Sequence, residues 1–361
     1  MKHSLIAFAA LAALSNLAAA QSSVTIYGKV DLGLVVDSGN AAGKSVRISS
    51  GVSGGSRLGF KGVEDLGGGY KASFQIETGF CADSAAPVVT TVPVKNSSGA
   101  TIGTTTTSVP NFCTGSNSFM GRQAHGDLSG AFGSISAGRQ YSLGFNNLST
   151  IDPFGEGYSA DINNMVDGAG LRLNNSFHYT TPAFGGFTAS GEVALGEQTG
   201  NWKGARVTAG SINYASGPAY AGLVVYNLDN TNGSGTARRD TQFGGTYDFG
   251  IVKVHALAEK ATGTPTGAAK LDTLDLMGGL TIPLASGSVL ADYIHHDDKG
   301  VLNHDASQLG LGYVYPLSKR TSIYSSYARI QNRHGATFTV GNATEAGTGD
   351  KAFSLGVVHN F

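Results

Sequence analysis

Apolar and polar residues alternate along almost the whole chain, and this period of two limits the folds open to it. Between Val24 and Leu34, apolar side chains alternate with residues such as Lys29 and Asp31, and the same period closes the chain up to Phe361. Such alternation predicts β-strands with one apolar and one polar face. Beyond residues 1–20, no stretch of ten residues shows a helical pattern. The sequence therefore predicts an all-β protein.

The connections between the predicted strands alternate in length. Turns such as 67–69, 217–218 and 285–287 are short, whereas the connections between them include 81–117 and 143–171. The pattern predicts sixteen strands: 22–38, 56–66, 70–80, 118–128, 133–142, 172–182, 187–198, 205–217, 219–230, 238–249, 251–262, 270–284, 288–298, 306–317, 321–332 and 351–361.

An even number of strands with short turns at one end and long loops at the other is typical of outer-membrane barrels. A tilted membrane strand needs about 9–11 residues, which agrees with these lengths. Because lipid cannot satisfy unpaired backbone groups, a sheet in a membrane must close on itself. We therefore predict a 16-stranded antiparallel transmembrane barrel with short periplasmic turns, long extracellular loops and a water-filled lumen.

The composition fits this interpretation and excludes others. Mean hydropathy is close to zero, as expected when lipid-facing and lumen-facing residues average out. The formal net charge of −1 argues against a nucleic-acid-binding protein. Residues 1–20 resemble a secretory signal, with Lys2 before an apolar run and small residues before Gln21. We expect a mature barrel over 21–361.

The chain contains two cysteines, Cys81 and Cys113, both in the enlarged second long loop. In an exported protein a disulfide is the default expectation, and two free thiols are the alternative.

A search for catalytic or metal-binding patterns gives little. Gly51–Gly55 has the spacing of a hydrolase nucleophile elbow, but that motif needs a strand-to-helix turn and here lies between strands. His295, His296 and the acids up to Asp305 are metal-ligand types, but their spacing matches no compact site. We expect no catalytic residues, no metal and no cofactor.

Charges on the polar faces of the strands are the stronger signal. Alternation places Arg57 and Lys61 in the lumen, puts Lys71 on the same face as Glu77, and turns Arg172 inward together with His178. The directions of Arg122 and Arg139 stay open, because alternation is poor around both. One such charge alone would be a solvated residue without a role, whereas several arginines at one height would form a positive wall.

The chain also resembles the general porins of Gram-negative outer membranes, specifically the beta-proteobacterial and neisserial group. The resemblance covers nearly the whole chain and depends on the order and spacing of short motifs: Ser23–Gly28, Ser56–Gly67, Gly121–Ala124, Phe132–Gln140, Asn174–Ser176, Tyr179–Phe187, Tyr315–Thr321 and His359–Phe361.

This resemblance implies a homotrimer of barrels in the outer membrane, in contact with lipid and lipopolysaccharide. It implies that the third long loop, 143–171, folds inward to form a constriction. It further implies that arginines on the barrel wall face acidic groups across this constriction; the matching positions are Arg57, Arg122, Arg172, Glu77 and Asp152. Phe361 matches the terminal residue that the barrel assembly machinery reads.

Two departures from the family pattern stand out. Asp127 lies where the family usually has an apolar strand, so its charge requires an inward or interfacial position. The second long loop is enlarged, and it could either reach over a neighbouring subunit or shield the mouth of the barrel.

Together these observations predict passive diffusion of small hydrophilic solutes and ions, with a preference for anions. Alternatives are a channel specific for phosphate or carboxylate anions, an outer-membrane barrel enzyme, and a secreted β-rich adhesin or lectin.

Overall fold

The computed structural model describes residues 23–83, 88–95, 101–109, 119–166 and 170–361. The predicted signal segment 1–20 and Cys113 lie outside the described residues. The elements are β1 (Ser23–Asn40), β2 (Gly43–Ser50), β3 (Arg57–Gly67), β4 (Tyr70–Gly79), β5 (Val88–Lys95), β6 (Thr101–Val109), β7 (Gln123–Gly130), β8 (Gly133–Tyr141), α2 (Leu143–Ile151), η1 (Ile162–Asn164), β9 (Arg172–Thr180), β10 (Phe187–Ala194), β11 (Val207–Ser216), β12 (Ala219–Asp229), β13 (Thr236–Asp248), β14 (Lys253–Gly263), β15 (Leu271–Leu284), β16 (Gly287–Asp298), β17 (Ala306–Pro316), β18 (Thr321–Asn332) and β19 (Lys351–Asn360).

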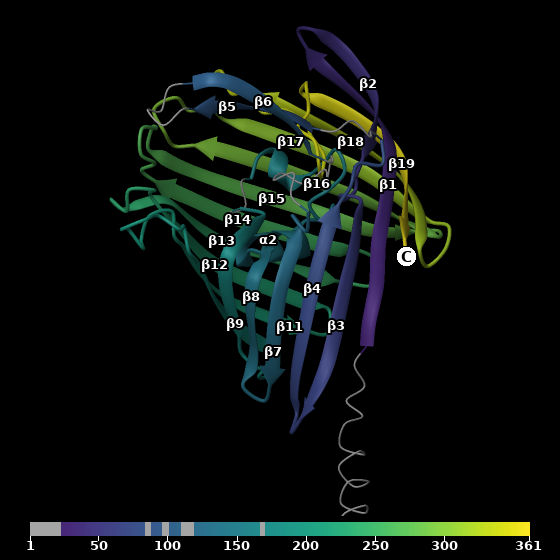
Figure 1. Cartoon of the computed structure of the whole chain (residues 1–361). Helices are drawn as coiled ribbons and strands as arrows, with labels where there is room; N and C mark the ends of the chain where they lie inside the picture. The colour runs from purple at the N-terminus through teal and green to yellow at the C-terminus, as the bar shows by residue number, and fades with distance from the viewer. Residues whose placement is uncertain (1–22, 84–87, 96–100, 110–118, 167–169) are drawn as a thin grey trace, which may run out of the picture.

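The main sheet closes into an antiparallel barrel, because the first strand pairs with the last (Figure 1). On its other edge, β1 pairs with β3 through its first half and with β2 through its second half. β2 and β3 therefore together occupy one strand position in the barrel wall, with an interruption at 51–56. Counted in this way, the 17 strands of the main sheet form the predicted antiparallel barrel of sixteen strands.

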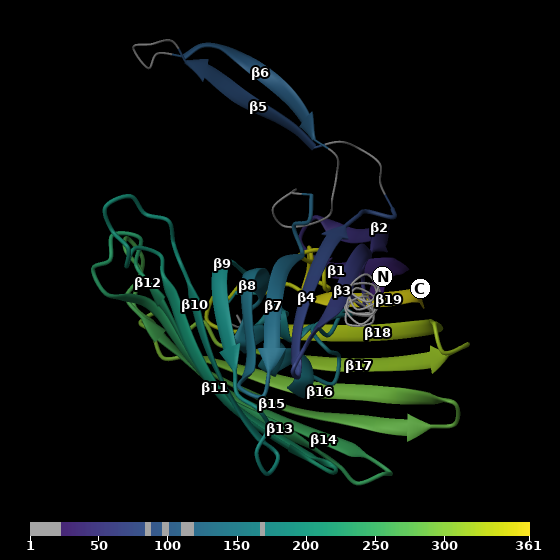
Figure 2. The same ribbon diagram turned by 60° about the horizontal axis from the view of Figure 1, so that its bottom comes forward.

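Three strands lie where the sequence analysis expected loops. β2 falls in the expected loop 39–55, where Val46 and Ile48 continue the outward apolar pattern and are more than half exposed. β5 and β6 fall in the expected loop 81–117 and pair only with each other in a separate two-stranded sheet (Figure 2). The strand expected from residue 118 begins later, at Gln123.

The outer face of the barrel is apolar, as the alternation predicts. Along β1, the outward residues Val24 and Ile26 are more than 60% exposed, whereas the inward Asp31 and Asp37 are buried. Aromatic pairs such as Tyr247 and Phe249 lie by the short turns, as in the aromatic girdles of membrane barrels. Among the described residues, no helix is long and apolar enough to cross a membrane.

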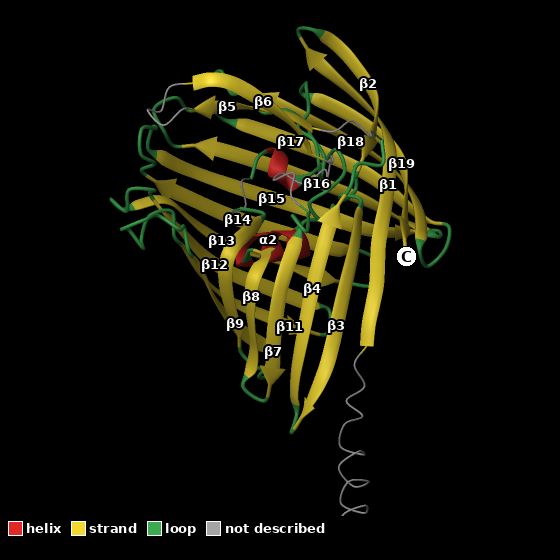
Figure 3. Cartoon of the chain, in the orientation of Figure 1, coloured by secondary structure: helices red, strands yellow, loops and turns green. Residues whose placement is uncertain are grey.

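The third long loop folds into the barrel, and Figure 3 shows α2 enclosed by the strands. Its apolar residues pack on the inner faces of β14–β19, and α2 also contacts β11–β13. The buried cluster contains, from the loop, Leu148, Ile151, Phe154, Ala160, Ile162, Met165 and Val166, and from the wall and the last long loop, Leu257, Met277, Leu290, Ile294, Ala306, Ala328, Ile330, Val340 and Ala352.

Candidate functional site

The beginning of the inward loop is tied to the barrel wall at the start of α2. The side chain of Ser142 caps the helix by accepting a hydrogen bond of 3.0 Å from the Phe145 amide. The Leu143 amide donates at 2.8 Å to Oε2 of Glu192, a buried carboxylate on β10. An anion is stabilised at a helix N-terminus, so Glu192 fixes where the loop leaves the wall.

Beside this loop, basic side chains gather on the inner wall of the barrel. Lys29 on β1 and Arg57 on β3 are register partners, so both point inward. Arg122 lies just before β7, and Arg172 opens β9. All four residues line one cavity of about 600 Å³, and we refer to them as the basic wall.

Glu77 lies within this basic wall. Its Oε1 accepts from Nε of Arg122 at 2.6 Å, and its Oε2 lies 3.5 Å from Nε of Arg57. The Tyr27 hydroxyl donates to the same carboxylate at 3.1 Å. Glu77 is only 3% exposed and does not line the 600 Å³ cavity, so its charge holds the two arginines in place.

Tyr141 connects the other two cations. Its hydroxyl accepts from Arg122 at 2.8 Å and from Arg172 at 2.7 Å. The Arg172 guanidinium lies 4.4 Å from the centre of the Tyr141 ring, which stacks at 4.4 Å on Phe145 of α2. A cation over an aromatic face is held without an acidic partner, so Arg172 keeps its positive charge uncompensated.

The acids that line the cavity come from the inward loop. They are Glu156 and Asp161, neither of which the sequence analysis singled out. Burial raises the pKa of Asp161 to about 6, and burial together with the neighbouring Asp161 and Asp152 raises the pKa of Glu156 well above its usual range. Both acids therefore titrate at a higher pH than exposed carboxylates.

The structure places Asp152, the loop acid named from the family pattern, away from the cavity. Its carboxylate is buried and accepts the backbone amides of Phe154 at 3.0 Å and Glu156 at 2.8 Å. Burial raises its pKa to about 7. Asp152 shapes the turn after α2, and Glu156 faces the cavity in its place.

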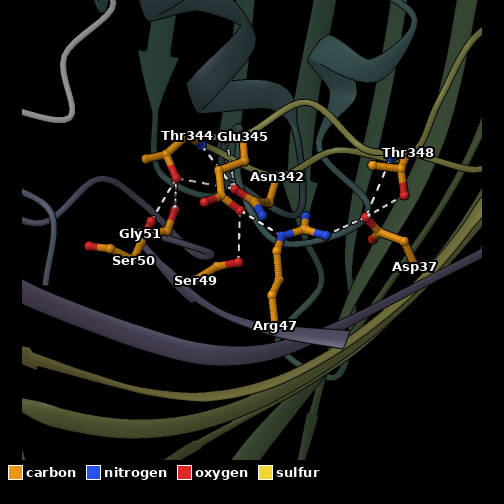
Figure 4. A network of polar contacts seen from close by, with 9 residues as sticks. All are labelled: Asp37, Arg47, Ser49, Ser50, Gly51, Asn342, Thr344, Glu345 and Thr348. Atoms are coloured by element: carbon orange, nitrogen blue, oxygen red, sulfur yellow. Dashed lines mark hydrogen bonds and ion pairs between the residues drawn. The ribbon is translucent and has the colours of Figure 1, made fainter. Parts of the chain in front are cut away.

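Two further segments complete the cavity: 53–55, between β2 and β3, and 342–344, in the last long loop. Figure 4 shows neighbouring contacts, centred on Arg47 of β2, that join residues 47–51 to the last long loop. Arg47 forms ion pairs with Asp37 and, at 3.0 Å, with Glu345. The Thr344 hydroxyl donates to the Ser50 carbonyl at 2.7 Å. Residues from both ends of the chain thus meet beside the inward loop.

The remaining predicted residues lie elsewhere. Lys61 and Lys71 share the inward face but lie toward the short turns, away from the cavity. Arg139 pairs in register with the outward-facing Ala124, beside a bulge. It binds the Gly121 carbonyl at 2.7 Å, so the register turns it away from the lumen.

Three other expectations concern residues outside the cavity. Asp127 shares the inward face of β7 and accepts a hydrogen bond from the Ser73 hydroxyl at 3.2 Å. Its charge therefore has the inward position that the sequence analysis required. The Phe361 backbone pairs with Gly28 through two hydrogen bonds of 3.0 Å. Cys81 is disulfide-bonded.

The cluster of histidines and acids around 295–305 forms separate local contacts. His296 binds Asp275 at 2.6 Å across the inner wall, and Asp298 accepts the Gly300 and His304 amides in the loop. Over the described part of the chain, no three His, Cys, Asp or Glu side chains are arranged to hold a metal ion.

The sequence analysis missed Lys29, Tyr141, Glu156 and Asp161. Lys29 and Tyr141 could have been found, because Lys29 lies on the polar face of the first strand and Tyr141 lies near the end of the predicted strand 133–142. Glu156 and Asp161 lie in a loop without a repeating conformation, where the sequence gives no direction for a side chain.

Comparisons with known proteins agree with this architecture. A family described as Gram-negative porin matches residues 7–335. Outer membrane porin protein 32 of Delftia acidovorans is 33% identical over the full length of both chains. The major outer membrane protein P.IB of Neisseria gonorrhoeae is 27% identical, over 95% of this chain and 98% of its own. A solved structure, the anion-selective porin from Comamonas acidovorans, superposes with a TM-score of 0.72 at 29% identity, over 94% of this chain and all of its own.

Proposed function

This chain belongs to the Gram-negative porin family and is a general outer-membrane porin, and from this premise we propose that its pore conducts anions in preference to cations. Small hydrophilic solutes and ions cross it by passive diffusion. The solved relative at 29% identity carries the description anion-selective, which supports the direction of the preference.

The basic wall is the observation that carries this proposal. Lys29, Arg57, Arg122 and Arg172 line the cavity, and within the described residues Glu77 is the one carboxylate that forms ion pairs with them. The wall therefore keeps a net positive charge even with Glu77 fully ionised.

The position of the charges matters more than the net charge of the chain. Charges beside a narrow aqueous passage with low-dielectric walls concentrate the field there and raise the local concentration of counter-ions. The slightly negative chain can therefore select anions. Glu156 and Asp161 on the opposite side give the field a component across the pore.

Reversal potentials of the purified porin in a planar bilayer under a salt gradient test the proposal. We expect the potential to have the sign of anion preference. Arg57→Gln and Arg172→Gln should each reduce it, whereas Arg239→Gln should leave it unchanged because Arg239 is exposed on the outer face, where it binds Asn227. Cation preference in the wild type would refute the proposal.

We further propose that the mature protein lacks residues 1–20 and assembles as a homotrimer in contact with lipopolysaccharide. In this proposal Cys81 pairs with Cys113, and the barrel assembly machinery reads Phe361. The disulfide-bonded state of Cys81 and the presence of just two cysteines in the chain support the pairing. N-terminal sequencing, native mass measurement and non-reducing peptide mapping test these points separately.

A further inference from the structure

Residues 51–56 connect β2 to β3, interrupt the strand position that the two share, and turn into the lumen. Among them, Ser53, Gly54 and Gly55 line the cavity beside the basic wall. This is the stretch whose glycines and serine resemble a nucleophile elbow in sequence. The structure gives Ser53 a different role, because its hydroxyl donates at 2.6 Å to the carboxylate of Asp31 and no helix follows it.

Asp31 holds this segment firmly. Its Oδ2 accepts the amides of Ser53 at 2.7 Å and Gly54 at 3.0 Å, and its Oδ1 accepts the Tyr324 hydroxyl at 2.6 Å. Asp31 is fully buried. A buried carboxylate satisfied by several donors at once is costly to disturb, so the backbone at 53–54 is fixed in the lumen.

The far side of the segment is fixed as well. Val52 is fully buried, and its carbonyl accepts the Tyr158 amide of the inward loop at 2.6 Å. The segment is therefore clamped between the barrel wall and the inward loop, and it cannot move aside to accommodate a larger residue.

Gly54 and Gly55 leave the space that two cations occupy. A Cβ atom at Gly54 would lie 2.9 Å from Nζ of Lys29, and one at Gly55 would lie 2.8 Å from a terminal guanidinium nitrogen of Arg122. Both contacts are shorter than real side chains allow. Neither glycine has a positive φ, so the backbone itself would accept alanine. The absence of a side chain at both positions is thus what allows the close approach of the two cations.

The two cations differ in how firmly they are held. Arg122 is bound by Glu77 at 2.6 Å and by Tyr141 at 2.8 Å. Lys29 has no hydrogen-bond or ion-pair partner among the residues that the structure describes. The position of the Lys29 ammonium beside Gly54 thus depends on the absence of a side chain at that residue.

We propose that Gly54 and Gly55 determine the ion specificity of the pore by seating the Lys29 ammonium and the Arg122 guanidinium against the clamped 51–56 segment. This rests on the proposed function, because it names the residues that position the charges of the basic wall. Gly54 acts through Lys29 and is a positioning residue. A methyl group there displaces the ammonium and leaves the fold intact, since the tip of a flexible side chain yields at low cost.

A double-mutant cycle tests the proposal, with reversal potential as the readout and the wild type, Gly54→Ala, Lys29→Gln and the double variant as its four proteins. In the wild-type background we expect Gly54→Ala to change the anion-to-cation permeability ratio by about twofold, because the field in a narrow passage depends on where its charges lie. In the Lys29→Gln background it should change nothing. Gly191→Ala is the control, because a Cβ at Gly191 meets no atom within 4 Å.

An unchanged ratio for Gly54→Ala, or the same change with and without Lys29, would overturn the proposal. If Gly54→Ala does not fold, as judged by heat modifiability on SDS gels, Gly55→Ala takes its place in a cycle with Arg122→Gln. Failure of both glycine variants to fold would also overturn it, because the glycines would then be needed for the backbone. A cation-selective wild type would refute the proposed function alone, since the coupling between Gly54 and Lys29 is measured independently of its sign.

Discussion

Nε of Arg122 lies 2.6 Å from Oε1 of Glu77, a carboxylate that is only 3% exposed. Arg57 approaches the other oxygen of the same group at 3.5 Å. One buried acid thus holds two arginines that would otherwise repel each other beside the cavity in the lumen. Glu77 stabilises the wall and at the same time reduces its positive charge.

We therefore expect Glu77→Gln to have two opposite effects. Removing one partner of a buried ion pair costs about 3 kcal/mol or more, so the free energy of unfolding in detergent should fall. Anion preference should rise, because a negative charge leaves the wall. Thermal unfolding and reversal potential measure the two effects, and Glu64→Gln, at an exposed strand glutamate, should alter neither. Weaker anion preference in Glu77→Gln would contradict this account.

The ion selectivity of the pore should depend on pH through the acidic residues of the inward loop. Burial raises the pKa of Asp161 to about 6 and that of Glu156 well above its usual range. Lowering the pH from 8 to 5 passes through the pKa of Asp161 and removes its negative charge from the passage, so anion preference should increase.

The matching variants make this prediction specific. Glu156→Gln combined with Asp161→Asn should show high anion preference already at pH 8 and little change down to pH 5. Glu197→Gln, at an exposed acid of another long loop, should keep the wild-type pH profile. A wild-type selectivity that is flat with pH, or that falls on acidification, would count against the assignment of these two acids.

Asp152 should make folding stability depend on pH in its own way. Burial raises the pKa of Asp152 in the folded protein to about 7, from an ordinary value of 3.8. The folded state therefore binds the proton more tightly than the unfolded state does, and this contribution to stability is lost as the pH rises through 7. Unfolding temperatures between pH 5 and 8 should decline in the wild type and decline less in Asp152→Asn. An equal decline in both proteins would assign the effect to other groups.

How much of this could be predicted from sequence depends on the kind of backbone involved. Regular strands repeat every two residues, so the direction of Arg57 and Arg172 followed from their neighbours. Arg139 escaped this logic because the register shifts beside it, between Gly138 and Gln140. In the inward loop, Glu156 has a φ of +58°, a conformation that no repeating pattern predicts.

The packing of the inward loop against the barrel wall could not be predicted from the sequence for a different reason. Alternation identifies an apolar face but does not show what covers it. Ile294 and Ile330 are apolar residues on the inner faces of their strands, fully buried under the inward loop. Only the packed structure distinguishes such residues from those that face lipid, such as Ile212, which is 55% exposed.

This packing predicts how the loop responds to a cavity. Ile151 is fully buried at the end of α2, and its carbonyl binds Nδ1 of His255 at 2.6 Å. Ile151→Ala should weaken docking of the loop by about 2–5 kcal/mol, the cost of a large-to-small change in a core. Because the barrel closes without the loop, single-channel recordings should show more open-channel noise while the barrel remains folded. Ile212→Ala is the control, since lipid fills the space it leaves; equal noise in both variants would argue against loop docking as the cause.

Closure of the barrel provides the last prediction. The Phe361 ring lies over Gly28, where an added Cβ would come within 2.3 Å of the ring and 2.6 Å of the Arg57 carbonyl oxygen. Gly28→Ala should therefore reduce the yield of folded barrel, measured as the heat-modifiable band on SDS gels. Removing the ring by Phe361→Ala should not restore the yield of refolding in detergent, where no assembly machinery reads Phe361, because the clash with the Arg57 backbone remains. Full rescue would show that the ring alone is the obstacle, whereas normal folding of Gly28→Ala would mean that the joint between the first and last strands tolerates a side chain that the observed geometry excludes.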